Sequence, residues 1–264
     1  MKKYLLLLFF ILSSINSFAN EKINIIGTTT HLSAIVKTLI PENSNVSTLI
    51  PYGMCPGHFD ISPNEVKQLN QADMILYQGF EHFIEDLFSS THSPFIKLKV
   101  AGNLMIPENH IQAAKNVAQV LAEKYPHLKN LITPNLEAYC QQIKNQEKEV
   151  KNRLKTFKNT PVLCAVMNKD FIEWSGLKVV ATIPRDEDIS LRSMQRIIGQ
   201  AKDANTRLII GNLQSSGKVG QTIADELRMP FVQVSNFPKD DDYLATLQNN
   251  CTQILNALQE NRNE

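Results

Sequence analysis

The sequence has few of the residues that mark fibrous, repetitive or disordered chains. Its 264 residues include only 10 Gly and 12 Pro, and no short period repeats along the chain. Collagen-like, solenoid and low-complexity architectures are therefore excluded. Hydrophobic residues make up 43% of the chain, which is enough for a sizeable core. A mainly disordered chain is therefore excluded.

An excess of charge of one sign is also missing. The 27 Lys and Arg residues balance 26 Asp and Glu residues, and the formal net charge is +1. Proteins that bind nucleic acid concentrate Lys and Arg on one face, so we expect no nucleic-acid partner. The chain also lacks a GxSxG elbow, an HExxH helix and a P-loop. We therefore do not expect an enzyme.

One apolar run stands at the start of the chain. Lys2 and Lys3 precede an unbroken apolar stretch over residues 4–12, and a polar stretch then ends at Ala19. A helix that spans a bilayer needs about 20 apolar residues, so this pattern predicts a signal peptide cleaved after Ala19 rather than a membrane anchor. No Cys stands at the cut, so we expect no lipid anchor. The mature protein is then soluble and exported, most simply to a bacterial periplasm.

Four cysteines would lie in a compartment where disulfides persist. They are Cys55, Cys140, Cys164 and Cys251, and four cysteines allow three pairings. A chain of this length builds a core without bridges, so buried free thiols are an equal alternative. Among the pairings we keep Cys164 with Cys251 as the working hypothesis.

Short β-branched runs alternate with helical stretches in two similar halves. This alternation predicts an α/β fold of two lobes, each with a parallel sheet flanked by helices. The predicted strands are residues 22–27, 46–50, 73–77 and 95–100 in the first half, and 161–166, 178–183, 207–211 and 231–235 in the second. The predicted helices are residues 32–39, 63–70, 191–201, 217–227 and 243–258.

A long polar segment separates the halves. Residues 134–157 carry apolar side chains near helical spacing, and Pro134 fits a first helical turn. A helix of about 24 residues is roughly 36 Å long, so it can join the two lobes as one stiff interlobe helix; a plain surface helix is the alternative. The predicted organisation is a signal peptide (1–19), an N-terminal α/β lobe (20–132), a linking helix (133–158) and a C-terminal α/β lobe (159–264).

Ligands of open parallel sheets bind beyond the carboxyl ends of the strands. At these ends the first half carries His31, His58 and His82, with Glu81 beside the last of them. Imidazoles from consecutive loops are the usual way to hold a divalent transition metal. The alternatives are structural: His31 opens a helix, and Glu81 with His82 forms a polar first turn.

The second half supplies residues that we expect to close over the cargo. They are Arg185, Glu187 and Asn236, each just after a predicted strand. Cys55 and Met167 are further possible cleft contacts, although Cys and Met at such junctions are usually core filler. The remaining histidines lie in polar surroundings away from strand ends, and we interpret them as solvated: His92, His110 and His127.

One stretch carries a family resemblance. LIPYGMCPGHFDISPNEVKQLNQADMILYQGFEHF resembles the signature of the zinc/manganese-type periplasmic solute-binding proteins that serve ABC transporters. The similarity continues through IPENHIQAAKNVAQVLAEKYP and IPRDEDISLRSMQRIIGQAK to ADELRMPFVQVSNFP, nearly the whole mature chain. The resemblance implies two lobes on one rigid helix, zinc or manganese bound in the interlobe cleft, and delivery to a membrane permease with its ATPase. We expect the protein to act as a monomer.

The chain departs from the family at the metal ligands. His58 matches the first family histidine, while the other three positions carry no imidazole or carboxylate: Gly102 or Asn103, Met167 or Asn168, and Asn236. Either the site has migrated to the histidines of the first lobe with Glu81, or the cargo is copper, a chelated metal or a small organic molecule. A periplasmic metallochaperone, which passes metal to a partner protein, would use the same fold and is the alternative function.

Overall fold

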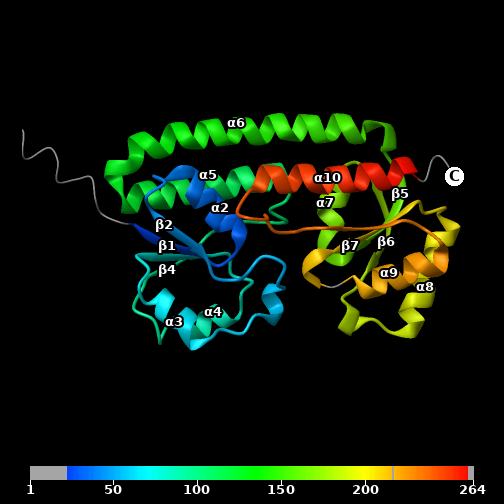
Figure 1. Ribbon diagram of the computed structural model, residues 1–264, viewed down its shortest axis with the longest axis horizontal. Helices are drawn as coiled ribbons and strands as arrows, with labels where there is room; N and C mark the ends of the chain where they lie inside the picture. Colours follow the sequence, from blue (N-terminus) through cyan, green and yellow to red (C-terminus); the bar gives the residue numbers. More distant parts are fainter. Residues whose placement is uncertain (1–22, 216, 261–264) are drawn as a thin grey trace, which may run out of the picture.

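The computed structural model describes residues 23–215 and 217–260, so the predicted signal peptide lies outside the described residues. Within these residues, eight strands form two four-stranded parallel sheets, one in each half of the chain. Figure 1 shows the two sheets side by side beneath one long helix. The predicted two-lobed α/β fold is confirmed. No helix in the described ranges is long and apolar enough to cross a bilayer.

The first sheet has the strand order β2-β1-β3-β4. Side chains alternate between its two faces because successive residues of a strand point in opposite directions. Ile25 and Met74 pack under α2 and α5, whereas Ile26 and Ile75 pack under α3 and α4. The elements of this lobe are β1 (Asn24–Gly27), α2 (Thr30–Leu39), β2 (Asn45–Thr48), η2 (Pro56–His58), α3 (Pro63–Leu69), β3 (Met74–Tyr77), α4 (Phe83–Leu87), β4 (Phe95–Lys97) and α5 (Pro107–Lys124).

The second sheet repeats this plan with the strand order β6-β5-β7-β8. Cys164 and Ile210 face α7 and α10, while Leu163 and Ile209 face α8 and α9. The elements are β5 (Pro161–Ala165), η5 (Val166–Asn168), α7 (Lys169–Trp174), β6 (Lys178–Ile183), η6 (Asp186–Asp188), α8 (Leu191–Asp203), β7 (Leu208–Asn212), η7 (Leu213–Ser215), α9 (Lys218–Leu227), β8 (Phe231–Val234) and α10 (Tyr243–Glu260). All eight predicted strands are found, with ends that differ by a few residues.

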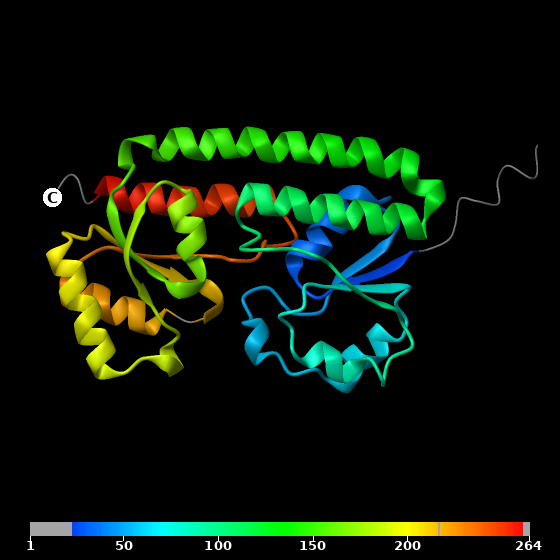
Figure 2. The same cartoon turned by 180° about the vertical axis from the view of Figure 1, so that it is seen from behind.

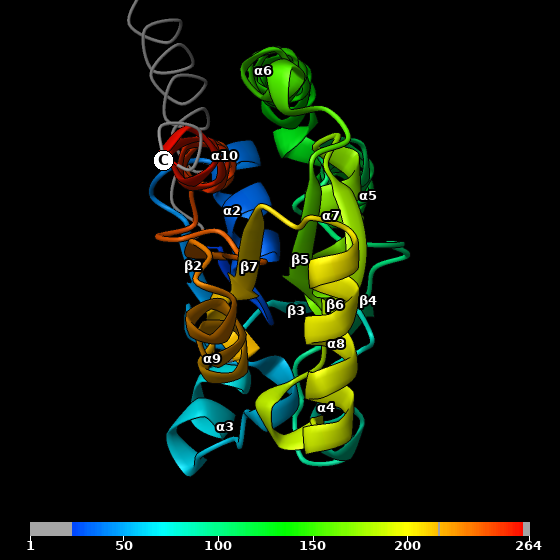
Figure 3. The same cartoon turned by 90° about the vertical axis from the view of Figure 1, so that its right-hand side faces the viewer.

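Helix α6 (Lys129–Leu154) connects the lobes. Figures 1 and 2 show it running the length of the molecule above α5 and α10, and Figure 3 shows α6 and α10 end-on at the same side. One buried apolar cluster takes residues from both sheets and from α6, including Ile143 and Val150. The core therefore continues from one lobe into the other beneath this helix.

The start of the linking helix differs from the prediction. Pro134 lies inside α6, and the helix begins at Lys129. The first-turn position belongs to Pro126, which opens the 3-10 turn η3 (Pro126–Leu128) that leads directly into α6. A proline fits a first turn because the missing N–H has no helical partner there. Inside the helix the missing N–H of Pro134 leaves one carbonyl without its helical bond, which makes this position less favourable for proline than a first turn.

The predicted disulfide is wrong. Cys164 and Cys251 are both free thiols buried in the shared apolar cluster, with exposed fractions of 0% and 1%. Burial raises the pKa of Cys164 to about 12, because the thiolate would lose its hydration. Both cysteines are buried free thiols that pack in the apolar core, which was the alternative prediction for these positions.

The close approach of α2 to β1 at Gly27 can be tested by substitution. A Cβ at this position would lie 2.7 Å from Ser33 Oγ and 2.8 Å from Ser33 N, so backbone must move. We expect Gly27→Ala to lower the free energy of unfolding by about 2 kcal/mol or more. Gly199, inside α8, has no atom within 4 Å of an added Cβ. Gly199→Ala should instead raise stability by about 0.5–1 kcal/mol, through helix propensity. Urea unfolding of both variants measures the difference, and equal effects would contradict this packing.

Candidate cargo-binding cleft

The carboxyl ends of the two sheets meet at the junction between the lobes. Asn103 follows β4 in the first lobe, Met167 follows β5 in the second, and Asn236 follows β8. The Nδ2 group of Asn103 donates to the Met167 carbonyl at 3.2 Å and to Asn236 Oδ1 at 3.1 Å. The Nδ2 group of Asn236 donates to the same Met167 carbonyl at 2.9 Å. We call these two side chains and this carbonyl the amide bridge.

The amide bridge satisfies its own polar groups. Asn103 Oδ1 accepts from the backbone N–H of Met105 at 2.8 Å, and the N–H of Asn236 donates to Gln214 Oε1 at 3.0 Å. Three positions at which the family resemblance places ligands therefore do come together, but they carry neutral amides and a thioether residue. Amides are poor replacements for imidazole and carboxylate on Zn²⁺ or Mn²⁺.

His31 supports the amide bridge from inside the first lobe. Its side chain is 2% exposed, and its Nε2 lies 2.8 Å from the carbonyl oxygen of Asn236. Burial lowers the pKa of His31 to about 4, against the opposing effect of this hydrogen bond. The ring is therefore neutral at pH 7 and donates its Nε2–H to the carbonyl. Its Nδ1 has no hydrogen-bond partner.

The sequence analysis did not identify His110 as part of this junction, and its prediction as a solvated residue is wrong. It is fully buried on α5, where its ring stacks on Tyr243 at a centroid distance of 3.7 Å and lies 5.3 Å from His31. Its Nε2 lies 2.9 Å from the Tyr139 hydroxyl. Burial, followed by the proximity of His31, lowers the pKa of His110 well below its usual value. The missed signal is the apolar stripe of α5, on which His110 stands one turn before Ala113 and Ala114.

Glu81 and His82 have separate structural positions. The Glu81 carboxylate is 2% exposed and accepts hydrogen bonds from Thr28 Oγ1 and from the N–H of Gly79 at 2.7 Å. It therefore holds the loop after β3 rather than facing the cleft as a free ligand. His82 is exposed at the start of α4 and makes no capping bond.

His58 lies at the rim of the junction. Its Nε2 is 3.2 Å from Glu187 Oε1, so this contact joins η2 of the first lobe to η6 of the second. Both side chains are about half exposed, at 58% and 48%, and pairs this exposed contribute little stability. Gly57 leaves room beside it for the guanidinium of Arg185, with the thiol of Cys55 on the same side. Arg185, Glu187 and Asn236 thus all lie at the junction; their contact with cargo stays a prediction.

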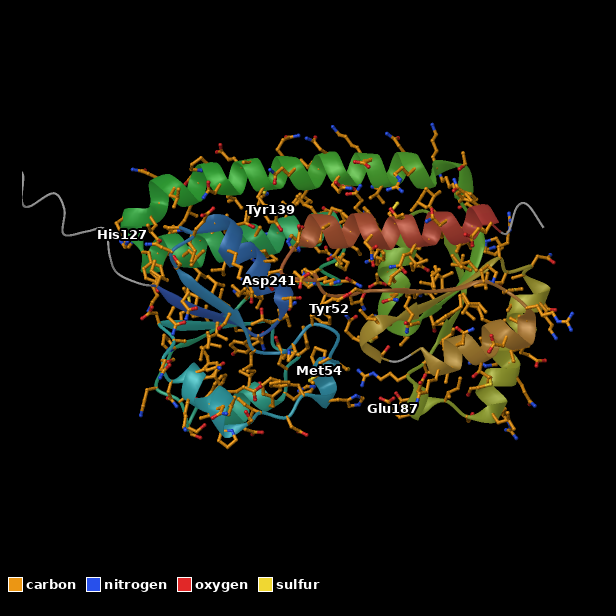
Figure 4. All side chains as sticks on the ribbon, in the orientation of Figure 1. Tyr52, Met54, His127, Tyr139, Glu187 and Asp241 are labelled. Atoms are coloured by element: carbon orange, nitrogen blue, oxygen red, sulfur yellow. The ribbon has the colours of Figure 1, made fainter. Side chains whose placement is uncertain are left out.

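Asp241, labelled in Figure 4, makes a further contact between the lobes. Its carboxylate accepts from Lys37 Nζ at 2.6 Å and from Thr48 Oγ1 at 3.2 Å. Asp240 and Asp241 both adopt left-handed backbone, with φ of 53° and 56°. Non-glycine residues rarely do so, and the conformation costs about 1 kcal/mol per residue. The interlobe bonds of Asp241 offset part of that cost.

The four side chains proposed as metal ligands in the first lobe do not converge on one metal position. In the described ranges, no three His, Cys, Asp or Glu side chains are grouped closely enough to hold a metal ion. The expected convergence of His31, His58, His82 and Glu81 is therefore not found, because His31 is bonded beneath Asn236, His58 pairs with Glu187, and Glu81 holds its own loop. Their separate assignments as ligands stay predictions.

The comparisons with known proteins decide the family. The chain matches the family model described as "ZnuA: Zinc-uptake complex component A periplasmic" over residues 25–257. The chain belongs to this family. It is therefore a substrate-binding protein rather than an enzyme, and the predicted resemblance is confirmed.

Curated relatives agree with this family. The chain is 23% identical to "Uncharacterized protein RP014" of Rickettsia prowazekii, over 97% of this chain and 89% of that protein. It is 25% identical to "Metal ABC transporter substrate-binding lipoprotein ScbA" of Streptococcus cristatus, over 54% of each chain. The match to the streptococcal protein thus spans about half of its length.

Solved structures show the same fold. The "Crystal structure of ZnuA" superposes with a TM-score of 0.77 at 19% identity, covering 90% of this chain and 100% of that one. The periplasmic zinc binding protein TroA from Treponema pallidum has a TM-score of 0.78 at 16% identity, covering 90% and 99%. The "SBP FpvC from pseudomonas aeruginosa in complex with Mn2+" has a TM-score of 0.77 at 19% identity, covering 91% and 99%.

The buried His31 predicts a pH dependence of stability. Its folded pKa of about 4 lies below the unfolded value of 6.5, so the unfolded chain takes up the proton first as pH falls. The free energy of unfolding should therefore decrease from about pH 6.5 downward, by about 3 kcal/mol at pH 4 from this group. His31→Gln keeps a donor for the Asn236 carbonyl but does not titrate. Urea unfolding from pH 7 to pH 4 should fall less steeply for this variant, and an unchanged slope would contradict the assignment.

The amide bridge predicts a gain of metal binding on isosteric substitution. Asn103→Asp together with Asn236→Asp would place two carboxylates beside the Met167 carbonyl, and these are oxygen donors that bind divalent cations. We expect the double variant to bind Mn²⁺ at least tenfold more tightly than the native chain in calorimetric titration. Asn145→Asp with Asn256→Asp adds the same charge on exposed helix positions. An equal gain in this control pair would show that net charge, rather than geometry, is responsible.

Proposed function

We propose that the chain is the periplasmic cargo-binding component of an ABC importer for a transition metal, zinc or manganese, and that it delivers this cargo to a membrane permease with its ATPase. The family description and the printed names of the relatives support the metal cargo. The observation that carries the proposal is the meeting of Asn103, Met167 and Asn236 at the junction. A cargo at this place touches both lobes at once.

Capture in this proposal starts at the open rim. His58 is 58% exposed and lies opposite Glu187 and Arg185, so it is reached first by a cation or its complex. An incoming metal competes with Glu187 for the His58 imidazole, and the freed carboxylate stays within reach of the cargo. The shared apolar core beneath α6 keeps the accompanying lobe movement small. Release follows when the permease pulls the rim contacts apart.

The signal peptide expected from the sequence supports the same role. A chain that carries a signal peptide cleaved after Ala19 reaches the periplasm, where the binding components of importers work. We propose that the mature chain acts there as a monomer, since its two lobes already provide both sides of the cleft.

Elemental analysis of the protein purified from its native periplasm tests this proposal. We expect about one transition-metal ion per chain, and cells that lack the chain should take up radiolabelled zinc or manganese more slowly. Replacing the rim imidazole by His58→Ala should reduce metal retention tenfold or more, about 1.4 kcal/mol. His127→Ala is the matched control, because His127 is also exposed but lies at the far end of the first lobe (Figure 4). Metal-free protein together with normal uptake would contradict the proposed function.

A further inference from the structure

Exposed apolar side chains gather at the junction of the lobes. Nine large hydrophobic side chains are exposed within the described residues, and six of these follow the strands β2, β3, β5 and β7 at their carboxyl ends: Tyr52, Met54, Phe80, Val166, Met167 and Leu213. Figure 4 shows Tyr52 and Met54 on the first lobe toward the junction, with Glu187 on the other lobe. A cluster of exposed apolar groups marks a ligand or partner site, because water contact with them is unfavourable.

A groove of about 600 Å³ opens beside the amide bridge. Tyr52 lines it from the first lobe, while Leu213, Ser235 and residues of α10 line it from the second. Ser235 directly precedes Asn236, so the groove lies one residue along the chain from the amide bridge. Sites for small organic molecules have volumes of roughly 300–1,000 Å³. The groove is therefore far larger than a metal ion needs.

The lining of the groove is suited to an organic molecule. The phenol ring of Tyr52 and the side chain of Leu213 are 38% and 36% exposed, which leaves apolar surface for a flat or hydrophobic body. The amides of Asn249 and Gln253 on α10 supply both donors and acceptors. Most of the other lining residues are also polar or charged, so the groove suits a polar molecule that carries an apolar part: Gln233, Ser235, Lys239, Asp240, Asp242, Thr246 and Asn250.

The amide bridge explains why such a molecule is needed. It offers no charged donor, and no group of three His, Cys, Asp or Glu side chains in the described ranges replaces one. A metal bound here must bring most of its donor atoms with it.

We propose that the cargo enters as a complex of the metal with a small organic chelator, whose body lies in this groove against Tyr52 and Leu213 and hydrogen-bonds to Asn249 and Gln253. This inference rests on the proposed function and specifies the chemical form of its cargo. The protein then recognises the chelator, and the chelator holds the metal.

Calorimetric titration of the mature chain tests this with three probes: Zn²⁺ alone, 8-hydroxyquinoline alone, and their complex. We expect the complex to bind at least tenfold more tightly than either component. Leu213→Asp should weaken binding of the complex at least tenfold. Leu131→Asp is the matched control, because Leu131 is 38% exposed on α6, outside the groove. Asn249→Leu, at an exposed position of α10, gives a second test that does not depend on the folding of the Leu213 variant.

The outcomes separate this inference from the proposed function. If Zn²⁺ alone binds as tightly as the complex, the chelate inference is overturned while metal import stands. If 8-hydroxyquinoline alone binds as tightly as its zinc complex, the metal adds nothing to recognition in the groove, and the chelate inference is overturned while metal import keeps its own test. If Leu131→Asp weakens binding as much as Leu213→Asp, the groove is not the site and the inference is overturned.

Discussion

The contact on which the rest of the structure depends is the amide bridge between the lobes. Asn103 and Asn236 are bonded directly to each other and to one carbonyl, and His31 holds the backbone of Asn236 from below. Every part of this contact is uncharged at pH 7, since burial keeps His31 neutral. The lobes are thus joined by neutral hydrogen bonds at the place where a bare cation would need charged or imidazole donors.

The shared core limits how the lobes can respond to cargo. Apolar side chains from both sheets pack in one cluster under α6, together with α5 and α10. Opening the cleft widely would separate part of this cluster, and each square ångström of apolar surface exposed costs about 25 cal/mol. Small movements of the rim loops, around His58 and Glu187, need no such exposure. The fold therefore favours a rigid scaffold with adjustable loops.

The sheets were predictable because their strands are short runs of apolar and β-branched residues, as in residues 178–183. The helix α5 was not predicted, because its first turn is polar and the two residues that continue its apolar stripe after His110 are small alanines; larger apolar side chains, Val117 and Leu121, come only further along the helix. His110 stands on this stripe, so its burial went unseen. The position of Pro134 misled the prediction of the linking helix, because a first-turn proline exists upstream at Pro126.

The candidate site was predictable in place but not in its bonding. The loops after the strands were identified because carboxyl ends of parallel strands share one edge. The bond from Asn103 to Asn236, however, joins residues 133 positions apart. Whether such side chains meet depends on the packing of the lobes, which no local pattern encodes. For the same reason, sequence placed His31 among exposed ligands, whereas the second lobe covers it through Asn236.

Anomalous X-ray diffraction from crystals of the protein loaded with its natural cargo would test the central claim most directly. The account predicts a metal peak whose nearest ligand atoms belong mainly to a bound organic molecule, with density for that molecule beside Tyr52 and α10. A peak coordinated by protein atoms alone, within bonding distance of His31, Asn103 and Asn236, would contradict it.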